Sequence, residues 1–217
     1  MSCFSFPARC LLVLAGIAMG FNVSTEALAQ PVQPPPTITA PELPGLLATL
    51  KRGGYVLYFR HLETRQDQED AQPVNLGDCT RQRNLSIEGQ ANGRVIGQAM
   101  AKSGLRFGQV LVSPFCRTRE TGRIIFGKFT DDPDLFFAIS LSEAEKSEKG
   151  AALRRLLGRA PEQGTNTAIV GHTSNLQEAV ELWPKPEGVA YVFRPDGKGG
   201  FAAVARIPPD VWQSASR

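Results

Sequence analysis

Short runs of consecutive hydrophobic residues alternate along this chain with stretches in which hydrophobic residues recur every three or four positions. The short runs predict buried strands at 55–59, 109–113 and 167–171. The periodic stretches predict helices at 41–51, 86–103, 116–126, 148–157 and 175–182. Because strand and helix alternate, we expect an α/β fold, a three-layer α/β/α sandwich with a mostly parallel central sheet.

The end of the chain departs from this alternation. Residues 189–193 and 201–207 flank the glycine-rich turn 196–200, which predicts a C-terminal β-hairpin. Residues 62–84 and 127–146 lack a clear period, and we expect both to be irregular. A long loop in a compact domain is often functional. We find no internal repeat, and we assign residues 41–217 to a single domain.

The first 40 residues have a different character. Arg9 precedes an apolar run from Leu11 to Phe21, and the small residues Ala27-Leu28-Ala29 follow. This order is typical of a secretory signal peptide, and the run is too short to cross a bilayer. We expect residues 1–29 to be removed by cleavage near Ala29, an uncleaved anchor being the alternative. The mature protein would then be periplasmic or secreted, without a stable membrane anchor, and residues 30–40 would form a proline-rich disordered leader.

Charge and cysteine content narrow the possibilities further. The 217 residues carry 24 basic and 21 acidic side chains, a formal net charge of +3. This weak basic bias suits a phosphorylated ligand and is far from the charge of a nucleic-acid-binding protein. After signal-peptide removal only Cys79 and Cys116 remain, so we expect them to form a disulfide in an oxidising compartment, two free thiols being the alternative.

The chain has only two histidines, and each follows a predicted strand. His61 comes after Arg60 at the end of the first strand, and His172 comes after the third. The strand between them leads into a turn that carries Arg117. Because α/β folds place their chemistry at the carboxyl ends of parallel strands, we expect these side chains to share one site. Arginine forks match phosphate oxygens, and a neutral imidazole can attack phosphorus, so the set indicates phosphoryl transfer.

Four motifs then carry a resemblance to a known family. They are Arg60-His61-x-Glu63-Thr64, Asn84-Leu85-Ser86-x-x-Gly89-Gln90-Ala91, Ser113-Pro114-x-x-Arg117-x-x-x-Thr121 and Gly171-His172. In this order, from about residue 50 to 207, the chain resembles the histidine phosphatase (phosphoglycerate-mutase-like) superfamily.

The resemblance implies a role for each site residue. His61 would be the nucleophile that is transiently phosphorylated. Arg60 and Arg117 would clamp the phosphoryl oxygens, His172 would complete the clamp, and Thr64 would add a hydroxyl contact.

Two positions depart from the pattern of the superfamily. Leu62 stands where a glycine usually follows the nucleophile. The residue that protonates the leaving group has no clear motif, and the stretch 141–145 occupies the place where the mutase-like branch has its glutamate. We therefore expect Glu143 to be the acid, with Glu145 as the alternative.

Other phosphatase and hydrolase chemistries lack their motifs. Neither Cys79 nor Cys116 has an arginine at the spacing of a cysteine phosphatase, and the chain has no P-loop and no Gly-x-Ser-x-Gly elbow. We expect an exported histidine acid-type phosphatase that needs no cofactor and no metal. It would act on a small phosphorylated substrate or a phosphoprotein, and not on nucleic acid. A non-catalytic phosphate-ligand-binding protein and a phosphomutase are the alternatives, and the sequence does not identify the substrate or the oligomeric state.

Overall fold

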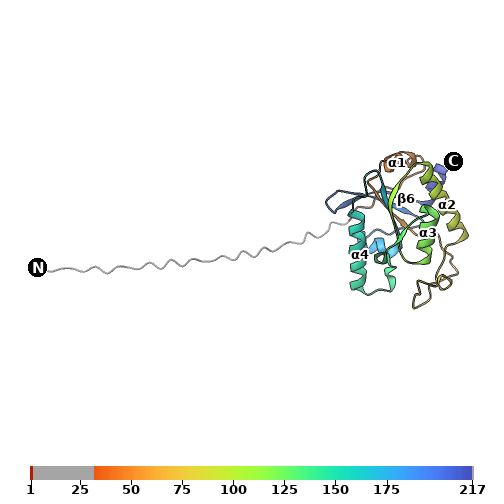
Figure 1. The fold of residues 1–217 in the computed structure, drawn as a ribbon, viewed down its shortest axis with the longest axis horizontal. Coiled ribbons are helices and arrows are strands. Elements are labelled where there is room, and N and C mark those ends of the chain that lie inside the picture. Colours follow the sequence, from red (N-terminus) through yellow and green to blue (C-terminus); the bar gives the residue numbers. More distant parts are fainter. Residues whose placement is uncertain (2–31, 217) are drawn as a thin grey trace. The chain divides into compact units, whose positions relative to one another are not determined.

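The computed structural model describes Met1 and residues 32–216 of the chain (Figure 1). The predicted signal peptide and its cleavage site therefore lie outside the described residues.

The helices and strands follow the predicted alternation. The strands are β1 (Val56–Arg60), β2 (Phe107–Val112), β3 (Thr130–Asp131), β4 (Asn166–Gly171), β5 (Ala190–Pro195) and β6 (Phe201–Ile207). The α-helices are α1 (Leu43–Leu50), α2 (Ile87–Lys102), α3 (Cys116–Phe126), α4 (Glu143–Gly158), α5 (Thr173–Val180) and α6 (Gln213–Ser216). Four short 3-10 helices are η1 (Cys79–Arg81), η2 (Pro133–Leu135), η3 (Ala138–Ser140) and η4 (Pro209–Trp212).

All six strands form one sheet in the order β3-β2-β4-β1-β5-β6. The strands β1 to β4 pair in parallel, whereas β5 pairs antiparallel with both β1 and β6. This arrangement confirms the predicted mostly parallel sheet with a C-terminal hairpin. It also brings β1 and β4, which are remote in sequence, side by side at the centre of the sheet.

Alternate residues of the central strands face two separate hydrophobic cores, because successive side chains of a strand point to opposite faces. Leu57 and Phe59 of β1 belong to the core that includes side chains of α1, α2 and α3. Val56 and Tyr58 belong to the core that includes side chains of α4 and α5. Figure 1 shows α2 and α3 on one side of the sheet and α4 on the other. The three-layer α/β/α prediction is therefore confirmed.

Two segments differ from the sequence-based expectation. Helix α4 begins at Glu143, earlier than the predicted start at Glu148, because Ser142 and Glu145 form a reciprocal capping box that satisfies free backbone N–H groups. In the predicted leader, the backbone of residues 36–38 hydrogen bonds to Arg206 of β6. That contact satisfies backbone groups at an open sheet edge, so these residues do not follow the expectation of disorder.

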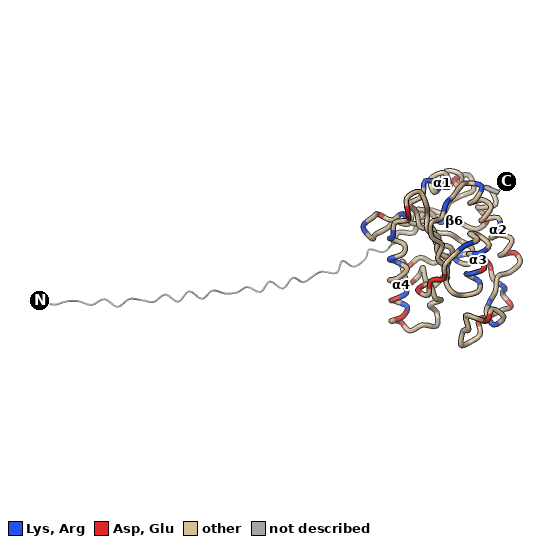
Figure 2. Tube along the Cα trace, in the orientation of Figure 1, with Lys and Arg blue, Asp and Glu red and all other residues tan. Residues whose placement is uncertain are grey.

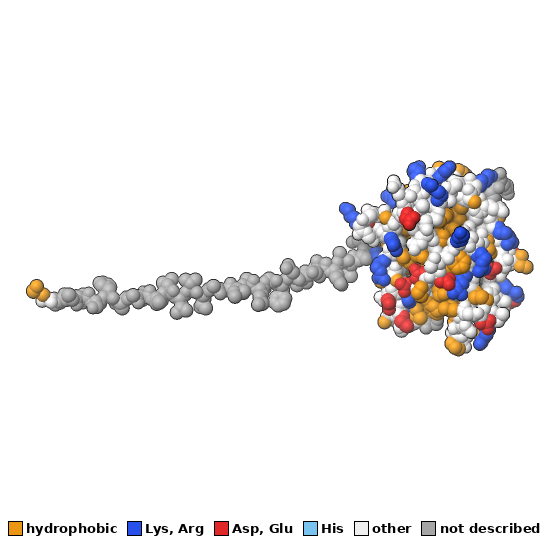
Figure 3. Space-filling view, in the orientation of Figure 1, with side chains coloured by type: hydrophobic (Ala, Val, Ile, Leu, Met, Phe, Trp, Pro, Cys, Tyr) orange, Lys and Arg blue, Asp and Glu red, His pale blue; other side chains and the backbone are white. Residues whose placement is uncertain are grey.

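The surface does not separate into regions of one charge. In the first half of α4 acidic and basic residues are mixed, whereas its second half carries only basic ones (Figure 2). On the face drawn in Figure 3, exposed hydrophobic groups lie between basic side chains. Among the described residues, no helix is long and apolar enough to cross a membrane. Charge alone therefore does not identify a site, and its location follows from the strand ends.

Candidate active site

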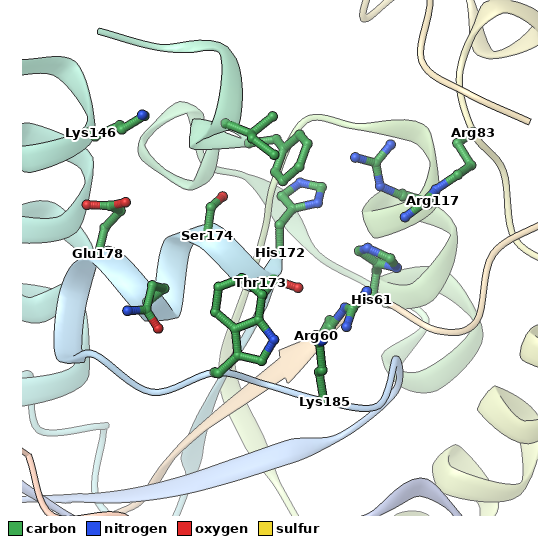
Figure 4. Close-up of a pocket in the computed structure, with 14 residues that line it drawn as sticks. Arg60, His61, Arg83, Arg117, Lys146, His172, Thr173, Ser174, Glu178 and Lys185 are labelled. Carbon is green, nitrogen blue, oxygen red and sulfur yellow. The ribbon is translucent and has the colours of Figure 1, made fainter. Parts of the chain in front are cut away.

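The two histidines leave the sheet side by side. Arg60 is opposite Gly171 in the parallel pairing of β1 with β4, so His61 and His172 occupy equivalent positions one residue further on. The His61 backbone N–H donates to the Gly171 carbonyl at 3.0 Å. The pocket beside them has a volume of about 380 Å³, and Arg117 from the first turn of α3 also lines it (Figure 4). The structure therefore brings together four of the predicted site residues.

Both imidazoles are buried, and they contact each other. Their ring centroids are 5.4 Å apart, and the side chains are only 2% and 1% exposed. Burial lowers the pKa of both His61 and His172 well below the usual 6.5, and the nearby Arg117 guanidinium lowers both further. Both rings are consequently neutral at physiological pH, the form in which an imidazole nitrogen can act as a nucleophile.

A backbone contact fixes the tautomer of His61. Its Nδ1 lies 2.8 Å from the Leu62 carbonyl oxygen, which can only accept a hydrogen bond. Nδ1 must therefore carry the proton in the neutral ring, and Nε2 retains its lone pair.

His172 presents its other nitrogen. Its Nε2 lies 2.8 Å from the Ser113 hydroxyl, whereas its buried Nδ1 has no partner in the described part of the chain. If the Ser113 hydroxyl donates to Nε2, then Nδ1 is an N–H donor. A buried donor without a partner is costly, which indicates a site built for an acceptor ligand.

Three arginines surround the imidazoles, each held by a carboxylate or a carbonyl. Arg60 donates to Glu187 at 3.0 Å and to the Pro184 carbonyl at 3.1 Å. Arg83, also in the lining, donates to Glu187 at 3.3 Å. Burial lowers the pKa of Arg60, but the Glu187 carboxylate opposes this effect, and an arginine stays cationic in any case. These fixed cations are suited to a phosphate dianion.

Arg117 is the most deeply buried of the three. Its Nη1 donates to both carboxylate oxygens of Asp70, at 2.9 and 3.0 Å, and its guanidinium packs over the Phe115 ring at 4.6 Å. The Nε atoms of Arg117 and Arg60 are buried and have no partner in the described residues. His172 Nδ1 is the third buried nitrogen among the lining residues that has no partner in the described part of the chain.

Glu187, Asp70 and Arg83 were not identified from the sequence. Arg83 and Asp70 lie in the polar loop 62–84, which was expected to be functional only on account of its length. Glu187 lies between α5 and β5, where no motif marks it. Ion pairs between residues remote in sequence leave no local pattern, so only the fold reveals them.

The predicted disulfide between Cys79 and Cys116 is confirmed. It joins the loop 62–84 to the first residue of α3, and Gln82 in the same loop accepts the Cys116 backbone N–H at 2.9 Å. The disulfide therefore anchors the loop that supplies Asp70 beside the helix that supplies Arg117.

The remaining predicted residues lie elsewhere. The Thr64 hydroxyl donates to Glu187, and Thr64 is not part of the pocket lining. Glu143 is 90% exposed and pairs with Lys146, while Glu145 caps α4. The one carboxylate in the lining, among the described residues, is Glu178 of α5. The structure therefore does not bring Glu143 or Glu145 together with the histidines.

Leu62 is accommodated away from the pocket. Its side chain is buried in the hydrophobic core, and a Cβ on Gly93 of α2 would lie 2.3 Å from its Cδ1. The absence of a side chain at Gly93 makes room for Leu62. A leucine directly after His61 is therefore compatible with an open pocket.

No group of three or more histidine, cysteine or acidic side chains that could hold a metal occurs within the described residues. Besides the two imidazoles and three guanidiniums, the described lining carries the ammonium groups of Lys146 and Lys185 and the carboxylate of Glu178.

No family model and no curated protein matches this sequence. Solved structures do match. The protein histidine phosphatase SixA complexed with tungstate is 18% identical over 72% of this chain and 97% of its own, with a TM-score of 0.52. A phosphoserine phosphatase from Entamoeba histolytica in complex with phosphoserine is 13% identical over 72% of this chain and 98% of its own, with a TM-score of 0.51. The ecdysone phosphate phosphatase from Bombix mori in complex with tungstate is 16% identical over 71% of this chain and 92% of its own, with a TM-score of 0.50.

At these identities the likeness is one of fold. The similar structures are phosphatases of the superfamily that the four sequence motifs resemble. The chain has the fold of the histidine phosphatase superfamily.

Proposed function

We propose that this protein is a phosphatase that hydrolyses a phosphomonoester through a phosphohistidine intermediate on His61. The observation that carries the proposal is the contact between the His61 and His172 rings, 5.4 Å between centroids, in a pocket lined by three arginines. Phosphoryl transfer depends on positioning and on stabilisation of charge on the equatorial oxygens, which fixed cations and N–H donors supply. The similar solved structures are phosphatases, which supports the class of reaction.

The first chemical step uses the lone pair of His61 Nε2. It attacks phosphorus in line, and the bond from phosphorus to the leaving oxygen breaks with its electron pair on that oxygen. Arg60, Arg117 and the His172 Nδ1–H hold the three equatorial oxygens, which gives the buried unpaired nitrogens their acceptors. In the second step a water oxygen bonds to phosphorus and releases its proton to solvent, and the P–N bond returns its electrons to Nε2.

The geometry does not support the prediction that Glu143 or Glu145 protonates the leaving group. Glu143 is exposed and paired with Lys146, and Glu145 is committed to the capping box. We infer that neither glutamate delivers this proton in the described arrangement. We also infer that Thr64 acts through Glu187, because that carboxylate takes both its hydroxyl and its backbone N–H.

We further propose that the protein is exported and works in a periplasmic or secreted location. The charged, apolar and small-residue order of the first 29 positions supports this proposal. The Cys79–Cys116 disulfide supports it independently, since disulfides persist in oxidising compartments. N-terminal sequencing of the protein recovered from the producing cell would test the cleavage near Ala29.

A non-catalytic phosphate binder is the second candidate, favoured by the lack of a carboxylate beside His61 within the described lining. Measuring the turnover of an aryl phosphate distinguishes the phosphatase from the binder. The proteins to compare are the wild type, His61→Asn and the control variant Ile87→Ala, which alters an exposed position of α2. If the protein is a phosphatase, the wild type and Ile87→Ala should turn over the substrate and His61→Asn should not. Circular dichroism should show that all three proteins are folded. Phosphate binding without turnover in the wild type would favour the binder, and equal turnover by His61→Asn would exclude His61 as nucleophile.

A further inference from the structure

The pocket has two chemically different ends. The inner end holds the buried imidazoles and arginines described above. The outer end adds three hydrophobic side chains, Phe137, Ile139 and Trp183, which lie among polar side chains that include Lys146 and Lys185. Phe137 and Ile139 belong to the η3 segment, whereas Trp183 follows α5, so two separate parts of the chain supply this apolar rim.

Two of the rim side chains are unusually exposed for their type. Ile139 is 68% and Trp183 is 54% exposed. Isolated exposed hydrophobic residues are common, but these two line the same pocket as the phosphate-binding residues. Apolar surface with a few convergent polar groups is typical of a small-molecule site, and a volume of about 380 Å³ falls in the size range of such sites.

Aromatic surface also continues inward from this rim. The Phe137 ring lies 4.9 Å from the His172 ring and 5.4 Å from the Arg117 guanidinium carbon. At the rim, the Lys185 ammonium lies 5.3 Å from the centre of the Trp183 ring and restrains it through a cation–π contact. The Phe137 ring is therefore within reach of a group attached to a phosphate held by Arg117.

Among the described residues, the inner end of the pocket has no carboxylic acid placed to protonate the leaving oxygen. Asp70 and Glu187 both accept hydrogen bonds from arginines. Glu178 is the one carboxylate of the described lining, and Figure 4 shows it beside Lys146, on the far side of the pocket from His61 and Arg117. A leaving group that departs without proton donation must be a weak base, and a phenolate is far weaker than an alkoxide.

We propose that the substrates of this site are small phosphate monoesters of planar aromatic alcohols, that is, aryl phosphates whose ring packs against Trp183 and Ile139. This inference rests on the proposed function. His61 Nε2 forms the P–N bond as the P–O(aryl) bond breaks, and the phenolate takes a proton from water. Water then cleaves the P–N bond, so that aryl phosphate and water give a phenol and inorganic phosphate.

The kinetic test compares 2-naphthyl phosphate with phenyl phosphate, whose leaving groups are similarly acidic but differ in planar apolar area. The wild type should favour the naphthyl ester in kcat/KM by about tenfold. Trp183→Ala should abolish the preference, Trp183→Phe should retain most of it, and Ile87→Ala, which alters an exposed isoleucine outside the pocket, should keep it in full. Equal values for the two esters in the wild type, or a preference that survives in Trp183→Ala, would overturn the proposal.

Two further substrates test the remaining parts of the claim. Glycerol 3-phosphate should be hydrolysed at least about a hundredfold more slowly than phenyl phosphate, and comparable rates would show that an acid assists the leaving group. A peptide that contains phosphotyrosine should be hydrolysed no faster than free phosphotyrosine. A gain above tenfold would assign the leaving group to a protein and contradict a small-molecule substrate.

A binding measurement keeps this inference separate from the proposed catalysis. By calorimetry, benzylphosphonate should bind about tenfold more tightly than methylphosphonate, and Trp183→Ala should remove this difference, whereas Ile87→Ala should keep it. If His61→Asn retained turnover but this binding pattern held, the nucleophile would be wrong and the aromatic site right. If the phosphonates bound equally, the aromatic site would be wrong whatever the catalytic result.

Discussion

The substitution Glu187→Gln probes how the arginines of the proposed phosphate clamp are held in place. The Glu187 carboxylate is 12% exposed and accepts hydrogen bonds from Arg60 at 3.0 Å, from Arg83 at 3.3 Å and from the Thr64 backbone N–H at 2.9 Å. Glutamine keeps the shape, removes the charge and turns one acceptor into a donor that faces other donors. Breaking one side of a buried ion pair costs about 3–5 kcal/mol, and residual exposure with one retained oxygen reduces this to about 2–3 kcal/mol.

For a domain of this size, that loss corresponds to a melting temperature lower by roughly 4–12 °C. Arg60 would lose the anchor that orients it, so kcat/KM should fall about 10- to 100-fold, and affinity for inorganic phosphate should fall with it. Thermal denaturation followed by circular dichroism, together with steady-state kinetics, would measure both. Glu148→Gln, the same change at an exposed position of α4, is the matched control and should alter neither. If Glu187→Gln were indistinguishable from this control, the account of a carboxylate-held clamp would be refuted.

Three further results are expected from the same site. Burial lowers the folded-state pKa of His61 and His172 below their unfolded value of 6.5, so the unfolded chain binds more protons. The free energy of unfolding should therefore decline as pH falls below about 6.5, by up to about 1.4 kcal/mol per pH unit for each ring. Denaturant unfolding between pH 7.5 and 5 that shows no such decline would contradict the buried, neutral state of the two rings. Reduction of the Cys79–Cys116 disulfide should destabilise the protein by about 3–4 kcal/mol and weaken phosphate binding. Thermal melting and calorimetry with and without reductant would measure the two effects. An unchanged phosphate affinity would show that the disulfide is not needed to position the loop 62–84. Arg117→Lys should lower kcat/KM by about 100-fold, since an ammonium cannot reproduce the fork that contacts Asp70 and a phosphate together, and a loss below threefold would argue against bidentate recognition.

The fold was accessible from the sequence because local patterns and tertiary packing agree. Leu57 and Phe59 alternate with Val56 and Tyr58, and each pair faces its own core. The two histidines were accessible for the same reason: each directly follows a buried central strand. Helix α4 begins earlier than predicted because its polar first turn, which starts at the Ser142–Glu145 capping box, has no hydrophobic periodicity.

The supporting residues were not accessible in this way. Glu187 is 127 positions from Arg60, and Asp70 is 47 positions from Arg117. Nothing in the sequence near Glu187 marks it as the partner of a residue so far away. The apolar rim could not be predicted either, because Trp183 and Ile139 lie in different connections and line one pocket only in the folded chain. Pairings of this kind depend on topology rather than on local periodicity.

Locating the transferred phosphoryl group would test the proposed role of His61 as nucleophile. The protein would be mixed with an aryl phosphate, quenched within milliseconds in alkali, in which phosphohistidine survives, and digested for mass spectrometry. We expect a single phosphorylated peptide with the modification on His61, present in the wild type and in Ile87→Ala and absent from His61→Asn. A phosphoryl group on His172, or on any other residue, would contradict it, as would rapid turnover with no phosphorylated peptide at all.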